Sequence, residues 1–333
     1  MGCRFYKKWY GLKRRPQFGE TFSKALKNDT ASVGSLAGIA LDKLNPPIIR
    51  AAATQYIGNF PTRKSFDVLT KMLHDKNPMI RKEAVKTYPL LDRKSYLNTL
   101  APLLTDSVRM VRLNVTYALS AIPPEMFDTA TKTVFDKNVK EYVKVMNYSA
   151  DFAASRHNLG NLYTNLGDFK KAEENYKEAI RIDNLFYPAK VNLAMLYNRT
   201  GKNDKAEKLL KEVTVSNPEL PDTWYSLGLL MAEKKDYKAS AVYLKKASEL
   251  MPDRPRVFYN LALVLDYLQQ KAQAEKAFKT AVQLQPDNGD YLSALIGFYM
   301  KNGNSPEAAK LLKRWVELHP EDQSAKDMLN RMD

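Results

Sequence analysis

The residues that could do chemistry in this chain are few and far apart. Its three histidines, His74, His157 and His319, lack the H-x-x-x-H spacing that places two metal ligands on one helix face. Cys3 is the single cysteine, so the sequence has no internal disulfide, cysteine-based zinc site or C-x-x-C-H haem attachment. Glycine-rich phosphate loops and a Gly-x-Ser-x-Gly elbow are absent too. We therefore predict no catalytic residue, metal or cofactor in this chain.

Amide and aromatic side chains recur in the second half of the chain at multiples of 34 residues. An asparagine amide both donates and accepts hydrogen bonds, so a row of them could bind the backbone of an extended peptide while tyrosines hold its side chains. The alternative is that these asparagines only solvate or cap local packing. The candidate residues are His157, Asn158, Asn161, Asn192, Met195, Tyr225, Leu229, Tyr259, Asn260 and Leu263.

A second candidate is a basic and aromatic segment near residue 1. Cations interleaved with aromatic rings could contact the phosphates and bases of a nucleic acid. The interpretation we favour is docking, in which the aromatic rings pack onto the first helices or a neighbouring domain and the cations stay solvated. The residues of this segment are Lys7, Lys8, Trp9, Tyr10, Lys13, Arg14, Arg15 and Phe18.

The elements that must position these residues are helices, because the second half of the chain is a repeat array. Pro218, Pro252, Pro286 and Pro320 are spaced by 34 residues, the length of a tetratricopeptide repeat. Each proline ends one helix pair and begins the next. The period gives five repeats at 153–186, 187–220, 221–254, 255–288 and 289–322.

Each repeat places small residues where two antiparallel helices meet, as in Leu193-Ala194 and Leu227-Gly228. Ser240 and Trp315 stand where an alanine is usual, which predicts locally irregular packing in the third and fifth repeats. Carboxylates on exposed helix faces are expected to pair with lysines four residues later, as Glu173 does with Lys177.

The first half of the chain carries a period of 31 residues. Arg50, Arg81 and Arg112, each after an apolar residue, mark short helix pairs of the HEAT type. Asp75 and Asp106 each precede such an arginine by six residues, a spacing suited to an ion-pair ladder along the turns. We interpret this ladder as structural, because charges at the repeat spacing usually order a stack.

These periods predict an all-α fold, an α-solenoid of HEAT-like helix pairs followed by five tetratricopeptide repeats. We expect one continuous solenoid. Its predicted parts are a basic and aromatic segment at 1–20, HEAT-like repeats at 21–150, the tetratricopeptide array at 151–322 and a short capping helix at 323–333.

The order of these elements resembles the C-terminal region of large exported bacterial multihaem c-type cytochromes. The likeness rests on Trp9-Tyr10-Gly11 with the run 14–20, on 46–53, and on 141–151 leading into 158–163. The resemblance implies haem c bound by an upstream part, an exported or periplasmic location, and a haem-bearing domain or redox partner. The chain then corresponds to a fragment beginning after a haem module, or to a haem-free relative.

Composition narrows the function without deciding it. The net charge is +15, and residues 1–150 hold 25 basic against 12 acidic residues, a net +13. No stretch is long and apolar enough to suggest a membrane span, and no export signal is recognisable, which leaves a cytoplasmic location open. We predict a non-catalytic interaction scaffold that binds a protein or peptide on the concave face of its repeats. The alternatives are a docking module of a multihaem oxidoreductase and binding of an anionic polymer by the basic half.

Overall fold

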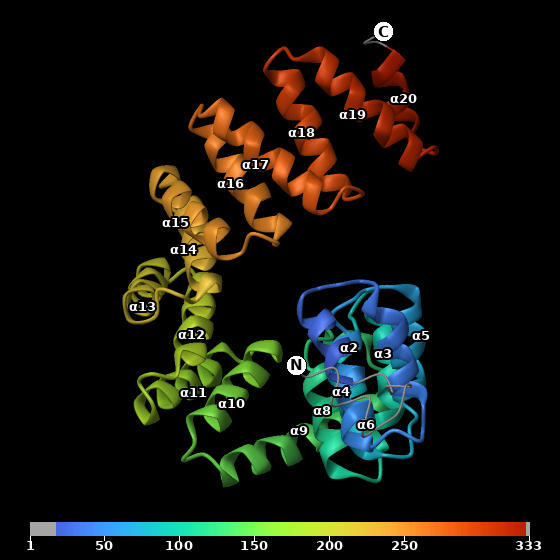
Figure 1. Cartoon of the computed structure of the whole chain (residues 1–333). Helices are drawn as coiled ribbons and strands as arrows, with labels where there is room; N and C mark the ends of the chain where they lie inside the picture. The colour runs from blue at the N-terminus through green and yellow to red at the C-terminus, as the bar shows by residue number, and fades with distance from the viewer. Residues whose placement is uncertain (1–17, 331–333) are drawn as a thin grey trace, which may run out of the picture. The chain divides into compact units, whose positions relative to one another are not determined.

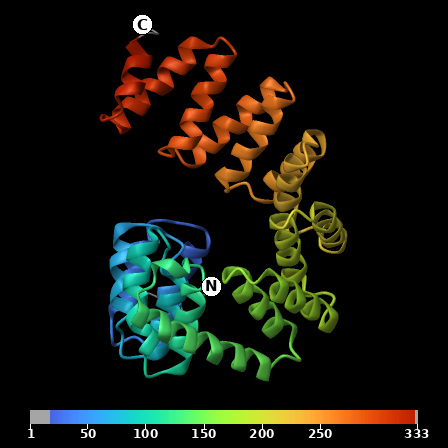
Figure 2. The ribbon, with the colours of Figure 1, turned by 180° about the vertical axis from the view of Figure 1, so that it is seen from behind.

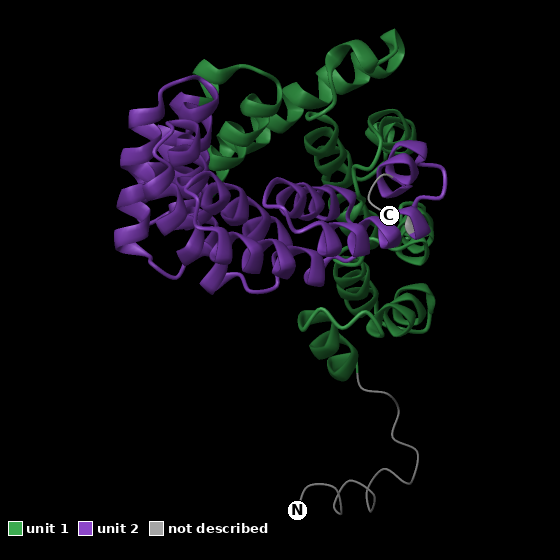
Figure 3. Ribbon diagram, turned by 90° about the horizontal axis from the view of Figure 1, so that it is seen from above, with its two compact units in different colours: residues 1–172 green, residues 173–333 purple. Residues whose placement is uncertain are grey.

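Residues 18–330 are described by a computed structural model, and they form nineteen α-helices, two short 3-10 helices and no strand. The chain divides into two compact units, unit 1 at residues 1–172 and unit 2 at residues 173–333 (Figure 3). The predicted all-α class, built of stacked helix pairs, is therefore confirmed for the described residues.

Unit 1 consists of short helices joined by tight turns. Proline opens α4 and α6, and side chains of Asn77 and Asp128 accept hydrogen bonds from the first backbone N–H groups of α6 and α9. The elements are α2 (Phe18–Leu26), α3 (Ser32–Leu41), α4 (Pro47–Ile57), α5 (Arg63–Met72), α6 (Pro78–Thr87), α7 (Arg93–Leu100), η1 (Ala101–Thr105), α8 (Arg109–Leu119), η2 (Pro124–Met126), α9 (Thr129–Tyr148) and α10 (Ala153–Asn165).

The 31-residue period of the sequence fills the core of unit 1. Helix α6 packs against both α4 and α8, so the second helices of successive pairs form one row. Ile80, Val111 and Leu119 are fully buried in this row, and Tyr88 is buried beside them. The apolar residues that repeat at equal intervals thus stack into a single core, as in other helical repeat proteins.

An arginine–aspartate ladder joins the successive turns of unit 1. Arg50 pairs with Asp75, and both Nε and Nη2 of Arg81 donate to the carboxylate of Asp106 at 2.7 and 2.8 Å. Arg81 also donates through Nη1 to the backbone carbonyl of Asp75 at 2.7 Å. The ladder predicted from the sequence is present, but each arginine pairs with the aspartate carboxylate one repeat further on. The six-residue spacing serves the backbone carbonyl instead.

The ladder aspartates are held in their ionised form. Burial opposes ionisation of Asp106, but the hydrogen bonds from Arg81 and from the backbone N–H of Val108 outweigh it and lower the pKa of that carboxyl. The pKa of Asp75 is lowered in the same way, against burial, by Arg50 and the N–H of Asn77. Both carboxylates are therefore charged partners of nearly buried arginines at neutral pH.

Unit 2 contains helix pairs of nearly constant length, which follow one another from α12 to α19 in Figure 1 and Figure 2. Helix α11 crosses the boundary between the two units. The helices are α11 (Phe169–Ile182), α12 (Tyr187–Arg199), α13 (Asn203–Ser216), α14 (Pro221–Glu233), α15 (Tyr237–Leu250), α16 (Pro255–Tyr267), α17 (Lys271–Leu284), α18 (Gly289–Lys301), α19 (Ser305–Leu318) and α20 (Gln323–Asn330).

The two helices of the third repeat, α14 and α15, approach closely at Gly228. A Cβ atom on Gly228 would lie 2.7 Å from Cγ of Leu244, a side chain that is fully buried. Ser240 is fully buried beside it, and its hydroxyl donates to the Gly228 carbonyl at 2.8 Å. The expected irregular packing is thus not found at Ser240, because the serine fits the close contact and satisfies its own hydroxyl.

In the fifth repeat, Trp315 takes the place of a small residue and a glycine makes room for it. A Cβ atom on Gly289 would lie 2.6 Å from the Trp315 ring. The indole N–H of Trp315 donates to the carboxylate of Asp322 at 2.9 Å, just before α20, and the ring packs against His319. The tryptophan therefore ties α19 to the turn that leads into the last helix.

A glutamate on the second helix of a repeat joins it to the next repeat. Glu173 pairs with Lys177 at 2.7 Å and accepts a hydrogen bond from the hydroxyl of Tyr197 at 3.0 Å. Burial opposes its ionisation, but Lys177, Lys202 and Tyr197 together lower the pKa of Glu173 to about 2. The ion pair predicted between Glu173 and Lys177 is confirmed, and we call this arrangement the glutamate staple.

The glutamate staple returns at two other junctions of unit 2. Glu275 pairs with Lys279 at 2.7 Å and accepts from the Tyr299 hydroxyl at 2.9 Å. At the junction between the second and third repeats, Glu207 pairs with Lys211 and with Lys234, both at 2.6 Å. A carboxylate at this one position of the repeat thus neutralises the neighbouring lysines.

Candidate functional site

Three apolar side chains lie exposed at the same position of consecutive first helices. Met195 on α12 is 57% exposed, Leu229 on α14 is 38% exposed and Leu263 on α16 is 44% exposed. The residues immediately before them, such as Leu193 and Ala194, are buried within the repeat, so the helical period turns the next residue outward. We call these three residues and the neighbouring polar side chains of α12, α14 and α16 the first-helix face.

Tyr225 and Asn260 join two helices of this face. The amide Nδ2 of Asn260 on α16 donates to the hydroxyl of Tyr225 on α14 at 2.7 Å. Burial raises the pKa of Tyr225, and Arg256 and Asn260 partly offset that rise. The pair therefore fixes the spacing of the two helices, and one donor of Asn260 is already used inside the protein.

Tyr259 is held between side chains of its own and the following repeat. Its ring packs against Tyr291 with centroids 5.1 Å apart and meets the edge of Phe278 at 6.4 Å. The guanidinium carbon of Arg256 lies 5.3 Å from the ring centroid. Tyr259 is consequently half-buried and offers one cation-covered side to the first-helix face.

The predicted residues of the first repeat belong to unit 1 and contact its other helices. Asn158 on α10 lies with Nδ2 4.0 Å from the sulfur of Met146 on α9. Nδ2 of Asn161 lies 3.5 Å from Nε2 of His157, whose pKa is lowered by burial. The Asn161 side chain also hydrogen-bonds to the phenol of Tyr117. These contacts are ones that local packing would produce.

The row of asparagines thus has mixed roles. Asn192 lies half-buried on α12 of unit 2, while Asn158 and Asn260 contact residues of the protein itself. An asparagine amide offers two donors and an acceptor, so a single internal contact leaves further groups for a ligand. Peptide binding by these amides stays a prediction.

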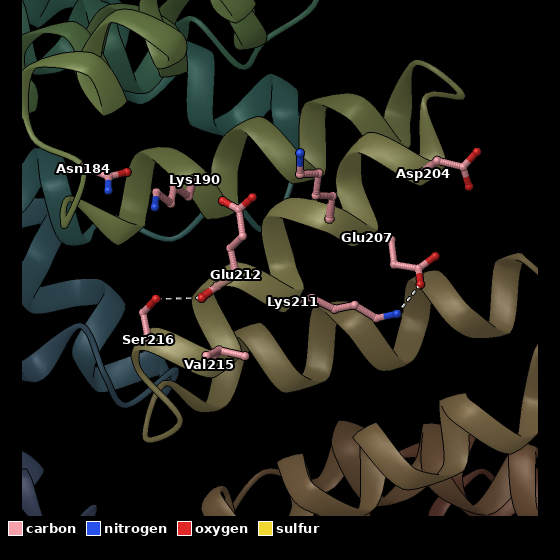
Figure 4. Close-up of a pocket in the computed structure, with 9 residues that line it drawn as sticks. Asn184, Lys190, Asp204, Glu207, Lys211, Glu212, Val215 and Ser216 are labelled. Atoms are coloured by element: carbon pink, nitrogen blue, oxygen red, sulfur yellow. Dashed lines mark hydrogen bonds and ion pairs between the residues drawn. The ribbon is translucent and has the colours of Figure 1, made fainter.

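Sequence reasoning missed a charged pocket of about 840 Å³ on α12 and α13. Figure 4 shows its lining side chains, with Lys211 directed toward Glu207. Lys190 belongs to this pocket and is only 6% exposed, at the repeat position that Trp224 and Phe258 fill with aromatic rings. The interruption of that aromatic pattern was the available signal in the sequence.

A second pocket, in unit 1, lies beside the predicted residues of α10. It has a volume of about 850 Å³ and is lined by Tyr96, Tyr117 and Tyr142 together with Asn158. Burial raises the pKa of all three phenols, and the rings of Tyr117 and Tyr142 stack at 6.1 Å. Asn158 is the one predicted site residue that lines it.

The basic and aromatic segment cannot be placed. Lys7, Lys8, Trp9, Tyr10, Lys13, Arg14 and Arg15 lie outside the described residues. Phe18, the last residue of this prediction, opens α2 and is half-buried. Docking and nucleic-acid binding by this segment both stay predictions.

Two searches of the described residues found nothing. Within residues 18–330 no group of three or more histidine, cysteine, aspartate or glutamate side chains is arranged to hold a metal ion. None of the helices in this range combines the length and hydropathy of a membrane span.

Helix pairs joined by an arginine–aspartate ladder, followed by helix pairs on a 34-residue period, define a helical repeat protein with HEAT and tetratricopeptide parts. Residues 36–120 match HEAT repeats. Residues 128–332, more than half of the chain, match the family described as the cilia and flagella-associated protein 70 C-terminal domain, and the chain belongs to this family. No curated protein sequence matches the chain.

Solved structures show a partial likeness to the chain. The crystal structure of MamA protein is 22% identical, covering 52% of this chain and 94% of its own, with a TM-score of 0.47. MamA from Desulfovibrio magneticus RS-1 is 20% identical over 51% and 97%, with a TM-score of 0.47. YrrB, described as a TPR protein with an unusual peptide-binding site, is 18% identical over 56% and 96%, with a TM-score of 0.47. Such distant likenesses carry no argument about function.

Proposed function

We propose that this protein is an interaction scaffold that binds an extended segment of a partner protein along the first-helix face. The observation that carries the proposal is the alignment of Met195, Leu229 and Leu263, which are exposed at one position of three consecutive first helices. A row of exposed apolar side chains at a fixed interval fits a partner that presents apolar residues along its length.

The polar groups around this row support an extended ligand. Asn192 and Asn260 flank the apolar side chains and have amide groups suited to a peptide backbone. The bond between Asn260 and Tyr225 fixes the distance between α14 and α16 before a ligand arrives, which lowers the entropic cost of binding. The face thus combines apolar contacts with preorganised hydrogen-bonding groups.

The test is affinity capture from the organism's own extract with the full chain and two variants. We expect Leu229→Asp with Leu263→Asp to lose captured partners, because two charges on the apolar row would have to be desolvated. Leu284→Asp is the matched control, since Leu284 is 40% exposed on the second helix α17. It should keep the captured proteins.

The amide groups are tested separately by Asn192→Ala with Asn260→Ala. This variant should weaken capture without abolishing it, because the apolar row remains. Equal capture by wild type, the aspartate variant and the control would refute the proposed function. Unchanged capture by the alanine variant alone would refute only the role of the amides.

The alternative of a docking module in an exported multihaem cytochrome stays a prediction that rests on the sequence resemblance. It would make the partner a haem-bearing domain, with haem c held outside these residues and an exported or periplasmic location. Several C-x-x-C-H motifs encoded in frame upstream of Met1 would support this alternative. Binding of an anionic polymer by the basic half likewise stays a prediction, tested by Arg14→Ala with Arg15→Ala.

A further inference from the structure

A groove of about 690 Å³ lies between α15 and α17, on the second helices of the third and fourth repeats. Its apolar lining comes from Phe258, Leu261 and Leu265 of α16, and Val242 on α15 is 64% exposed beside it. None of these residues belongs to the first-helix face. The groove is a separate surface of unit 2.

The groove exists because the glutamate staple is interrupted at this junction. The position held by Glu173, Glu207 and Glu275 in other repeats is Ala241 here. The tyrosine that bonds to the glutamate, Tyr197 or Tyr299 elsewhere, is replaced by Leu265. Two polar side chains that bridge neighbouring repeats are thus replaced by smaller or apolar ones, which leaves an open apolar floor.

The same interruption leaves cations without partners. Lys245 stands four residues after Ala241, where Lys177, Lys211 and Lys279 each find their glutamate. Lys238 and Lys276 also line the groove. Among the described residues, these three lysines make no hydrogen bond or ion pair through their side chains, and no carboxylate lines the groove.

We propose that this groove binds an acidic segment of a protein partner, which inserts a large apolar side chain between α15 and α17. Charge complementarity selects this occupant, because Lys238, Lys245 and Lys276 surround the apolar floor. Gln270 and Gln273 at the edge of the groove have amide groups for the backbone of the segment. The partner's carboxylates replace the glutamate that this junction lacks.

The decisive variant is Ala241→Glu, which restores the staple residue of the other repeats. The new carboxylate would pair with Lys245 and fill part of the groove, and the fold tolerates glutamate at the same position in three other repeats. The matched control is Ala309→Glu, the same change at the corresponding position of the fifth repeat, outside the groove. Circular dichroism verifies that both variants keep their helices.

The experiment selects short random displayed peptides on the full chain, with the Ala241→Glu variant in solution as competitor. Survivors should carry aspartate or glutamate around one large apolar residue. Fluorescence anisotropy with a labelled survivor should show about tenfold or weaker binding to Ala241→Glu and to Lys238→Glu with Lys276→Glu. Ala309→Glu and the aspartate variant of the first-helix face should bind as the wild type does.

Several results would overturn the proposal. They are a selection without survivors, survivors without acidic residues, and equal weakening by Ala241→Glu and Ala309→Glu. Loss of peptide binding in Leu229→Asp with Leu263→Asp would place the peptide on the first-helix face instead. That result would leave the proposed function standing while removing the groove.

Discussion

At Gly228 the contact between two helices is decided by a single carbon atom. A Cβ atom there would lie within 2.7 Å of Leu244 and 3.2 Å of its backbone nitrogen, so neither partner can easily move aside. The hydroxyl of Ser240 uses the same close approach to reach the Gly228 carbonyl. Glycine and serine at these positions therefore act together.

We expect Gly228→Ala to destabilise unit 2 although alanine favours helices. Overpacking a dense core costs about 1–3 kcal/mol, whereas alanine returns about 1 kcal/mol of helix propensity. The net loss should be about 1 kcal/mol, measured as a lower midpoint of urea unfolding. Gly297→Ala on α18 is the control, because nothing lies within 4 Å of its added Cβ. A gain of stability in both variants would contradict the close contact.

At the scale of the elements, the arginine–aspartate ladder separates buried ion pairs from exposed ones. The side chains of Arg81 and Asp106 are 12% and 6% exposed, whereas that of Arg109, which pairs with Glu141, is 55% exposed. Arg81→Ala should cost about 3 kcal/mol, because it leaves the Asp106 carboxylate buried without its cation. Arg109→Ala should change stability by less than about 1 kcal/mol. Unfolding of each variant in urea measures the difference, and equal costs would refute the structural role of the ladder.

The same ladder predicts an acid limb of stability. The folded-state pKa of Asp106 is lowered, so its contribution is fully present above the unfolded value of about 3.9. That contribution is lost as the pH falls below about 4 and through the lower folded-state pKa. We expect Asp106→Asn to be less stable than wild type at pH 7 and to lose less stability between pH 5 and acid. Parallel curves of unfolding free energy against pH would contradict the pairing.

The periodic parts of this molecule could be predicted, whereas the contacts between repeats could not. Spacing alone located the exposed side chains of Met195, Leu229 and Leu263, since each helix face is fixed by its own period. The bond from Asn260 to Tyr225 depends on how α14 and α16 are rotated against each other, which no single helix encodes. The groove at Ala241 could have been found by asking which repeat lacks the glutamate that the others share.

At the scale of the whole molecule, the uneven charge must be separated from specific binding. Residues 1–150 carry a net +13 and residues 151–333 hold 27 basic against 25 acidic residues, a net +2. Any acidic ligand will therefore be attracted to the first half at low salt, whatever surface finally binds it. Only a dependence on apolar side chains distinguishes the groove between α15 and α17 from this general attraction.

We expect salt to separate the two effects. Exposed charges are screened beyond about 10 Å at 0.1 M salt, so binding of heparin to the full chain should fall steeply as salt is raised. An acidic peptide selected on the groove should lose less affinity over the same range, because its apolar side chain is buried among Phe258, Leu261 and Leu265. Anisotropy titrations with this peptide, and with a variant whose large apolar residue is serine, measure both terms. The preference for the apolar peptide should persist at high salt, and affinity that falls in parallel with that of heparin would show that charge alone holds the peptide.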